Sequence, residues 1–194
     1  IKMNDIWTVL FAIYLLGILL LVGRNIIAHF SLLRLYLGGT KTKEEGYTLI
    51  DSPQIKTPFT VFNLIFANMG RMSEEARSSI LKHEVVHLRQ LHWVDLMFGE
   101  LALILQWFNP VAWAYLFTLK ENHEFLADKG VLAQGVSPAL YRAILVNERF
   151  DGKLFNFVNT LKYAGSLGRL AMMKKSKSSA WRRMLALVII PIFG

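Results

Sequence analysis

The apolar residues of this chain gather in long uninterrupted runs. The first, residues 6–23, holds 18 residues without a charge. A transmembrane helix needs about 20 apolar residues, with about 17 as the lower limit. A signal peptide has a shorter apolar run followed by a small-residue cleavage site, whereas Arg24, Asn25 and a further apolar helix follow here. We therefore expect a transmembrane helix, assigned to residues 1–28; a buried core helix is the alternative.

A second apolar run, residues 184–194, closes the sequence and follows a group of basic residues. Both runs have basic inner flanks, so the positive-inside rule places the chain between them in the cytoplasm. We expect a cytoplasmic domain over 29–172, a basic juxtamembrane segment over 173–183 and the start of a second, truncated transmembrane helix over 184–194. A buried helix is the alternative for the last run, and the chain is expected to be a fragment of a longer polypeptide.

Two extended segments are predicted inside the domain, over 46–50 and 56–68. The second is rich in Phe, Val and Thr, and Pro58 near its start is tolerated in an edge strand. Such an edge, near residues 59–63, can hold an extended peptide through main-chain hydrogen bonds. An ordinary sheet strand is the alternative.

Helices are predicted after the strands. Ser73 is a suitable N-cap, so a helix is expected from there to about Trp107. Asn109-Pro110 breaks it, and further helices are expected over 110–132 and 139–149. Residues 96–119 contain one charge, Glu100, and the break divides them into a helical hairpin, packed in the domain or against the bilayer surface. The predicted fold is mainly α and membrane-anchored, with a small sheet.

The first of these helices contains His83-Glu84-Val85-Val86-His87, an HExxH motif. Residues four apart lie on one helix face, so both imidazoles can bind one ion. Zinc accepts imidazole nitrogen, and a catalytic site leaves a position for water. Glu84 lies where a carboxylate can accept a proton from that water. The motif predicts a Zn²⁺ site with His83 and His87 as ligands and Glu84 as general base.

A third ligand must come from another part of the chain. The following helix carries Glu124 and Asp128, which share a face because they are four residues apart. One can bind zinc while the other hydrogen-bonds a ligand imidazole and fixes its orientation. Glu121, one turn earlier, is the competing ligand.

Three motifs in order, HEVVHLRQLHWVD, WFNP and NHEFLAD, resemble those of the BlaR/MecR-type membrane metallopeptidases, the beta-lactam sensor-transducers and their relatives. The resemblance implies a gluzincin-like zinc protease domain on the cytoplasmic side of a multi-pass bacterial inner-membrane protein. It also implies that His83, His87 and Glu124 bind zinc, that Glu84 is the base and that Asp128 supports a ligand. The family's biology implies cleavage of a cytoplasmic repressor, often with self-cleavage.

Other polar residues near these motifs are weaker candidates. Many family members have an acid where this chain has His92, so an output in antibiotic resistance is not assumed. His92 and His123 are candidate substrate or oxyanion contacts, with structural roles as the alternative. Arg89 and Asp95 are likewise candidate contacts to substrate or to a ligand, with packing or surface roles as the alternative. Ser79-Ile80-Leu81-Lys82 matches an SxxK motif, but its partner motifs are missing, so we interpret it as coincidence.

Charge and composition limit the kinds of chemistry and of binding partner that this chain can have. The chain has no cysteine, which excludes thiolate chemistry and disulfides. Of the net charge of +8, all lies in residues 152–194, which carry eight Lys or Arg and no acid. Because the basic stretch 169–183 precedes an apolar run, it favours anionic lipid over nucleic acid.

These features together predict an integral-membrane zinc metalloendopeptidase that acts on a protein or peptide, in regulated proteolysis of a protein such as a cytoplasmic repressor. The alternatives are a housekeeping membrane protease of the HtpX or CAAX-processing type and a non-cleaving, zinc-stabilised signalling module. Membrane lipid is an expected partner, a homodimer is an option, and direct nucleic-acid binding is not expected. The sequence leaves the substrate, the sensor and the oligomeric state open.

Overall fold

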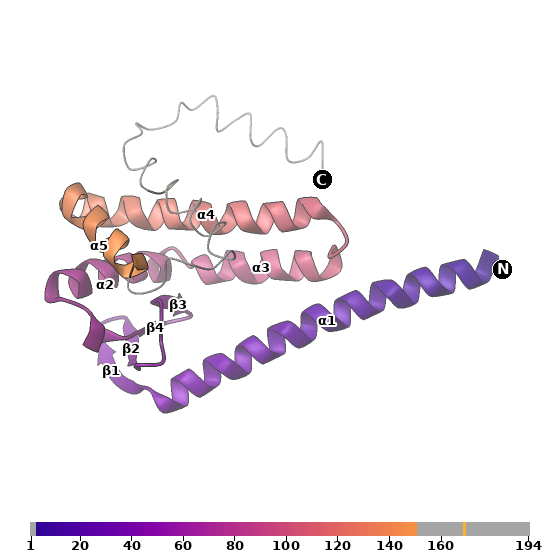
Figure 1. Cartoon of the computed structure of the whole chain (residues 1–194), viewed down its shortest axis with the longest axis horizontal. Helices are drawn as coiled ribbons and strands as arrows, with labels where there is room; N and C mark the ends of the chain where they lie inside the picture. The colour runs from indigo at the N-terminus through magenta and orange to yellow at the C-terminus, as the bar shows by residue number, and fades with distance from the viewer. Residues whose placement is uncertain (1–2, 151–168, 170–194) are drawn as a thin grey trace, which may run out of the picture.

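The computed structural model describes residues 3–150 and residue 169. It is mainly helical with one small mixed sheet, as predicted (Figure 1). The basic segment 173–183 and the second apolar run 184–194 lie outside the described residues. The elements, in chain order, are α1 (Met3–Gly38), β1 (Thr40–Glu44), β2 (Tyr47–Asp51), β3 (Phe59–Val61), β4 (Leu64–Ala67), a 3-10 helix (Met69–Arg71), α2 (Glu74–Arg89), α3 (His92–Leu105), α4 (Pro110–Ala133) and α5 (Pro138–Phe150).

The N-terminal helix α1 is continuous, where the sequence suggested two helices separated near Arg24. Asn25 Nδ2 donates to the carbonyl of Leu21 at 3.0 Å, and His29 Nδ1 lies 2.7 Å from the carbonyl of Asn25. These polar side chains bond back to their own helix and so do not interrupt it. Within the described part of the chain, α1 is the helix long and apolar enough to cross a membrane, by length and composition.

The sheet has the strand order β1-β2-β4-β3, with β2 and β4 parallel and the other pairs antiparallel. Strand β1 was not predicted, because all of its residues are exposed and polar. The segment 56–68 was predicted as one strand, but it forms a hairpin of β3 and β4. Phe62 turns the chain there with a φ of 54°. Strand β3 lies at the edge of the sheet, as expected.

The sheet packs on the C-terminal end of α1. Ile50, Ile55 and Phe66 are buried together, and Leu35 and Tyr36 of α1 contact them. This contact fixes the long helix to the small domain that carries the candidate site.

The helix predicted from Ser73 to Trp107 is two helices. Ser73 does cap α2, since its Oγ accepts from the backbone N–H of Ala76 at 3.3 Å. Leu91, however, adopts a left-handed conformation with φ of 54° and ψ of 35° and separates α2 from α3. Neither glycine nor proline marks this position, so the sequence offered no signal for it. The corner places His92 close to the end of α2.

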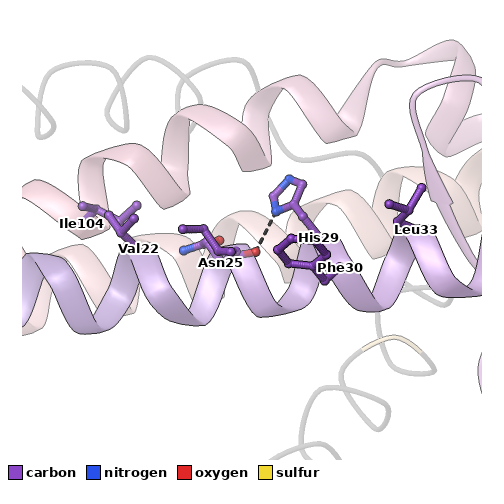
Figure 2. Close-up of a pocket in the computed structure, with 7 residues that line it drawn as sticks. Val22, Asn25, His29, Phe30, Leu33 and Ile104 are labelled. Carbon is purple, nitrogen blue, oxygen red and sulfur yellow. Dashed lines mark hydrogen bonds between the residues drawn. The ribbon is translucent and has the colours of Figure 1, made fainter.

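Helices α3 and α4 form the predicted hairpin (Figure 1). Asn109 caps α4, its Oδ1 accepting from the N–H of Val111 at 2.9 Å. Helix α5 also begins at Pro138, as expected for a first-turn proline. An apolar groove runs between α1 and α3 (Figure 2); it is lined by Val22, Asn25, Ile26, His29, Phe30, Leu33 and Ile104.

Candidate metal centre

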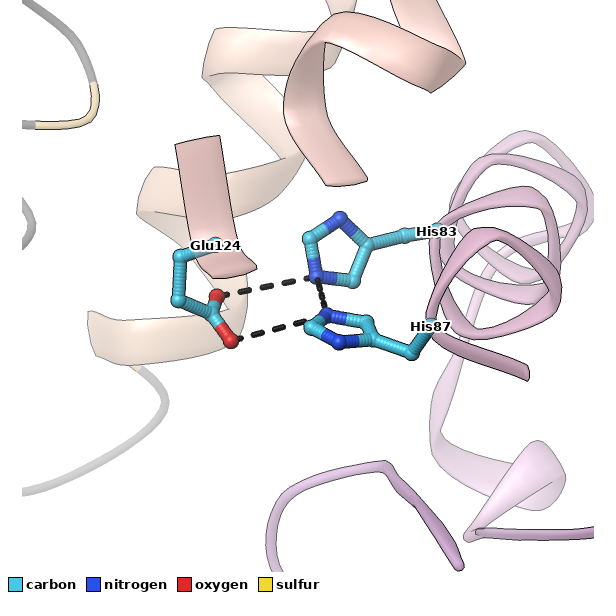
Figure 3. A group of neighbouring side chains, drawn as sticks. All are labelled: His83, His87 and Glu124. Carbon is cyan, nitrogen blue, oxygen red and sulfur yellow. Dashed lines mark hydrogen bonds and ion pairs between the residues drawn. The ribbon is translucent and has the colours of Figure 1, made fainter. Parts of the chain in front are cut away.

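Three side chains from α2 and α4 converge on one point (Figure 3). His83 and His87 lie one turn apart on α2, and their Nε2 atoms are 3.0 Å apart. Glu124 of α4 places one carboxylate oxygen 3.6 Å from His83 Nε2 and the other 3.6 Å from His87 Nε2. Glu124 therefore belongs to this group, whereas Glu121 does not.

Close packing of α2 on α4 makes this convergence possible. Gly130 of α4 faces Val86 of α2, and a Cβ at position 130 would lie 2.7 Å from a methyl carbon of Val86. That distance is shorter than real Cβ contacts allow. A glycine at this position lets the histidine-bearing helix approach the helix that carries Glu124.

The distal nitrogen of His83 is held by a buried hydrogen-bond chain. Tyr141 of α5 donates its hydroxyl proton to Asp128 Oδ1 at 2.8 Å, and its oxygen lies 2.8 Å from His83 Nδ1. Because the single hydroxyl proton is used on Asp128, His83 Nδ1 must carry a proton and donate it to Tyr141. Nε2 is then the nitrogen that faces His87 and Glu124, and it can bind a metal once it has given up its own proton. Asp128 thus supports His83 mainly through Tyr141, since its own oxygen is 3.4 Å from Nδ1.

Arg169 extends this hydrogen-bond chain beyond Asp128. Its guanidinium donates to both oxygens of Asp128, from Nε at 2.8 Å and from Nη2 at 2.6 Å. Nη1 lies 2.7 Å from Glu124 Oε2. Its basic neighbours predicted a lipid-facing position for Arg169, which is wrong for this residue, because its side chain is buried in the site. The planar guanidinium of an arginine has several N–H donors in fixed directions, so it can bind the carboxylates of Asp128 and Glu124 at the same time.

The distal nitrogen of His87 is held by a second imidazole. His92, at the start of α3, lies with its Nδ1 2.8 Å from His87 Nδ1 and its Nε2 3.0 Å from Gln90 Oε1. The amide oxygen accepts only, so His92 Nε2 carries the proton and His92 Nδ1 accepts one from His87. Burial, together with a neighbouring imidazole (His83 beside His87, His123 beside His92), lowers the pKa of His87 to about 3 and that of His92 to about 4. Both rings are neutral at pH 7.

His123 is buried beside this arrangement. Its ring stacks on His92 with centroids 4.0 Å apart, and its Nε2 lies 3.0 Å from Asp95 Oδ2. It is not part of the group formed by His83, His87 and Glu124. These contacts favour a supporting role for His123 over the candidate oxyanion contact.

Glu84 lies next to the two histidines and is almost fully buried. Thr60 of β3 donates its hydroxyl to Glu84 Oε2 at 2.7 Å. Burial raises the pKa of Glu84, and the neighbouring His83 and the Thr60 hydrogen bond offset part of that rise. A carboxyl whose pKa is raised toward neutrality can both take and return a proton.

The residues present fit a tetrahedral metal ion. With bonds of about 2.0–2.1 Å, the ligand atoms of a tetrahedral zinc lie about 3.3 Å apart, and the three donor pairs here are separated by 3.0, 3.6 and 3.6 Å. Burial opposes ionisation of Glu124, but the hydrogen bond from His83 and the charge of Arg169 outweigh it and lower its pKa to about 2. Two imidazoles and one carboxylate leave the fourth position for water, as in catalytic zinc sites.

Comparison with known families agrees with this geometry. The family model described as BlaR1 peptidase M56 matches residues 1–143. The chain belongs to this family. A comparison with curated proteins finds no match. The match spans α1 to the middle of α5 and so includes the HExxH motif, Glu124 and Tyr141. Membership supports peptidase activity of the BlaR1 type, and together with the apolar helix α1 it indicates association with a membrane.

Four supporting residues of this M56 peptidase were not found or not assigned from the sequence: Thr60, Gln90, Tyr141 and Arg169. Gln90 directly follows α2, whereas Thr60, Tyr141 and Arg169 reach the site from other parts of the fold, through tertiary packing. Arg169 lies beyond the matched residues, so neither the motif nor the family match pointed to it.

Proposed function

We propose that this M56 peptidase is an integral-membrane, zinc-dependent metalloendopeptidase with His83, His87 and Glu124 as zinc ligands. The observation that carries the proposal is the environment of Glu84, a buried carboxylate that interacts with His83 and whose Oε2 accepts a hydrogen bond from Thr60. A carboxylate fixed in this way is oriented for one task, proton transfer to and from a reacting group beside the metal ligands.

A zinc ion in this site supplies Lewis acidity, which lowers the pKa of a water molecule and polarises a peptide carbonyl. The chain's own contribution is the proton transfer. Glu84 accepts a proton as water adds to the carbonyl carbon, and it then delivers that proton to the nitrogen of the departing amine. Thr60 fixes one carboxylate oxygen, so the other is free to exchange the proton.

The position of the edge strand β3 is consistent with a peptide as the substrate. It is the last strand of the sheet, and its Thr60 side chain contacts Glu84 directly. A peptide that extends the sheet along β3 would bind through main-chain hydrogen bonds and pass beside the catalytic carboxylate. This mode needs an extended backbone and little side-chain selection.

The biological setting follows from the family and the charge pattern. A BlaR1-type peptidase with basic flanks next to its apolar helix fits regulated cleavage of a cytoplasmic protein such as a transcriptional repressor. The catalytic domain then faces the cytoplasm and the helix α1 anchors it in the membrane.

Peptide cleavage by matched variants tests the proposal. Wild type, Glu84→Gln and Glu75→Gln are purified in lipid, loaded with zinc and incubated with a complex peptide mixture, and new termini are identified by mass spectrometry. Glu75 is an exposed acid on the same helix. We expect products from wild type and Glu75→Gln but none from Glu84→Gln, with equal zinc content in all three. Zinc-loaded wild type that yields no products would instead indicate a non-cleaving signalling module.

A further inference from the structure

The charged residues that border the uncharged runs of α1, α3 and α4 form ion pairs with one another. Glu100 of α3 forms ion pairs with Arg24 of α1 and with Lys120 of α4, the latter at 3.3 Å. Beyond these ion pairs, residues 6–23 of α1 and residues 101–119 of the α3–α4 hairpin contain no Asp, Glu, Lys or Arg. The boundary between charged and uncharged sequence is therefore shared by segments far apart in the chain.

The end of the hairpin lies well beyond that boundary, against the middle of the apolar run of α1. Trp107 Nε1 donates to the carbonyl of Tyr14 at 3.1 Å, and Tyr14 Oη donates to the carbonyl of Leu105 at 3.1 Å. The Trp107 ring covers Gly17 so closely that a Cβ there would overlap it. Tyr14 precedes Arg24 by ten residues, about 15 Å along a helix, or half of the about 30 Å hydrocarbon core.

Several polar backbone groups at the turn between α3 and α4 have protein partners. Trp113 Nε1 donates to the carbonyl of Trp107 at 2.8 Å, and the N–H of Asn109 donates to the carbonyl of Gln106 at 2.8 Å. Asn109 Oδ1 accepts from Val111, and the carbonyl of Leu105 accepts from Tyr14. Non-helical backbone is tolerated at membrane depth only when protein groups replace water in this way.

The outer surface of the hairpin is apolar and open. Large hydrophobic side chains of α3, α4 and the turn between them are about half exposed or more at this depth: Leu101, Leu105, Phe108, Val111, Trp113, Tyr115 and Phe117. The exposed side chains on the neighbouring face of α1 have the same character, including Leu16 and Leu20. Both surfaces lie on the uncharged side of the Glu100 ion pairs.

We propose that the α3–α4 hairpin enters the bilayer as a re-entrant hairpin and that residues 101–119 contact lipid acyl chains, ending at mid-depth beside α1. The proposal rests on the membrane anchoring of α1 in the proposed function and is independent of catalysis. It differs from a hairpin that packs within the domain or on the membrane surface. Helix α3 follows α2 directly, so the metal centre is held close to the membrane surface.

Site-directed spin labelling tests this proposal directly, because the chain has no native cysteine. Single substitutions Phe108→Cys and Leu101→Cys place a nitroxide on the hairpin, at positions where the native side chain is more than half exposed. Leu16→Cys is the matched control on α1 at the depth of Phe108. Phe62→Cys, in the β3–β4 turn, is the control for an aqueous position. The full chain is reconstituted in phosphatidylcholine–phosphatidylglycerol vesicles, and collisions with oxygen and with a water-soluble nickel chelate are measured.

We expect the labels at positions 108 and 16 to collide often with oxygen and rarely with the nickel chelate. The label at position 101 should show the same preference at a shallower depth. The label at position 62 should collide often with the nickel chelate and rarely with oxygen. A label at 108 that meets nickel as readily as the label at 62 would overturn the hairpin proposal. So would a label at 108 shielded from both reagents, since that indicates protein contact, such as a second copy. Loss of the lipid signature at 16 as well would mean that the membrane anchoring itself is wrong.

Discussion

His92 Nδ1 lies 2.8 Å from His87 Nδ1, so the candidate metal ligand His87 is oriented by another imidazole. The other histidine, His83, is oriented by a chain that ends in the ionised pair of Asp128 and Arg169. Both immediate partners, the Tyr141 hydroxyl and the His92 imidazole, are neutral, but only the chain at His83 leads on to a carboxylate. A neutral acceptor makes an imidazole ligand less basic than a carboxylate does.

Replacing His92 should weaken zinc binding. His92→Ala removes the acceptor that keeps the proton of His87 on Nδ1, and loss of such a partner costs about 10–100-fold in metal affinity. His92→Glu restores an acceptor and should recover most of that loss. Affinity is measured by competition with a chromophoric chelator, with His29→Ala of α1 as the control. Equal affinity of wild type and His92→Ala would show that this contact does not support the ligand.

Zinc content should depend on Glu124 and not on Glu121. Both are acids on α4, but only Glu124 lies with His83 and His87. We expect about one zinc per chain in wild type and in Glu121→Ala, and a large loss in Glu124→Ala. The zinc content of each purified protein is measured by elemental analysis. Zinc retained in Glu124→Ala but lost in Glu121→Ala would refute the ligand assignment, and no zinc in wild type would refute the metal site.

Removing the charge of Arg169 should destabilise the folded domain. Arg169→Gln leaves Asp128 and Glu124 without their cationic partner, and breaking a buried ion pair from one side costs about 3–5 kcal/mol. Lys129→Gln, which removes an exposed charge beside Asp128, should change stability by no more than about 0.5 kcal/mol. Thermal unfolding of the two variants in the same lipid or detergent compares them. Similar melting temperatures would show that the Arg169 contacts contribute little.

Chelation should lower the melting temperature of the wild-type protein, and added zinc should restore it. A ligand that binds only the folded state at about 100 times its Kd stabilises that state by about 2.7 kcal/mol. Glu84→Gln should respond as wild type does, because Glu84 is not among the three proposed ligands. Glu124→Ala should respond weakly or not at all. A melting temperature that is insensitive to chelator in wild type would contradict a zinc ion that links α2 to α4.

Local signals in the sequence were sufficient for much of this architecture. The spacing of His83 and His87 dictates a shared helix face, and Ser73 and Asn109-Pro110 mark helix ends through cap and proline chemistry. The left-handed Leu91 could not be predicted, because its conformation depends on how α2 and α3 pack against α4. Strand β1 was missed because it has no apolar face.

The supporting residues of the site were harder to find for a related reason. Tyr141 lies in a correctly predicted helix, but nothing in its local sequence indicates that its hydroxyl reaches His83, 58 positions earlier. Arg169 was misinterpreted because its basic neighbours suggested a lipid-facing segment. Contacts of this kind depend on tertiary structure and carry no local periodicity.

The contact of Gly130 with Val86 has a consequence for how this chain tolerates mutation. The proposed ligands come from two helices, so their spacing depends on the distance between those helices. Any side chain at position 130 must push α4 away from α2 or displace Val86. Gly130 has no side chain and lies more than one helical turn from Glu124, yet it sets how closely a carboxylate and two imidazoles can meet, so a larger residue there should weaken metal binding although it touches no ligand.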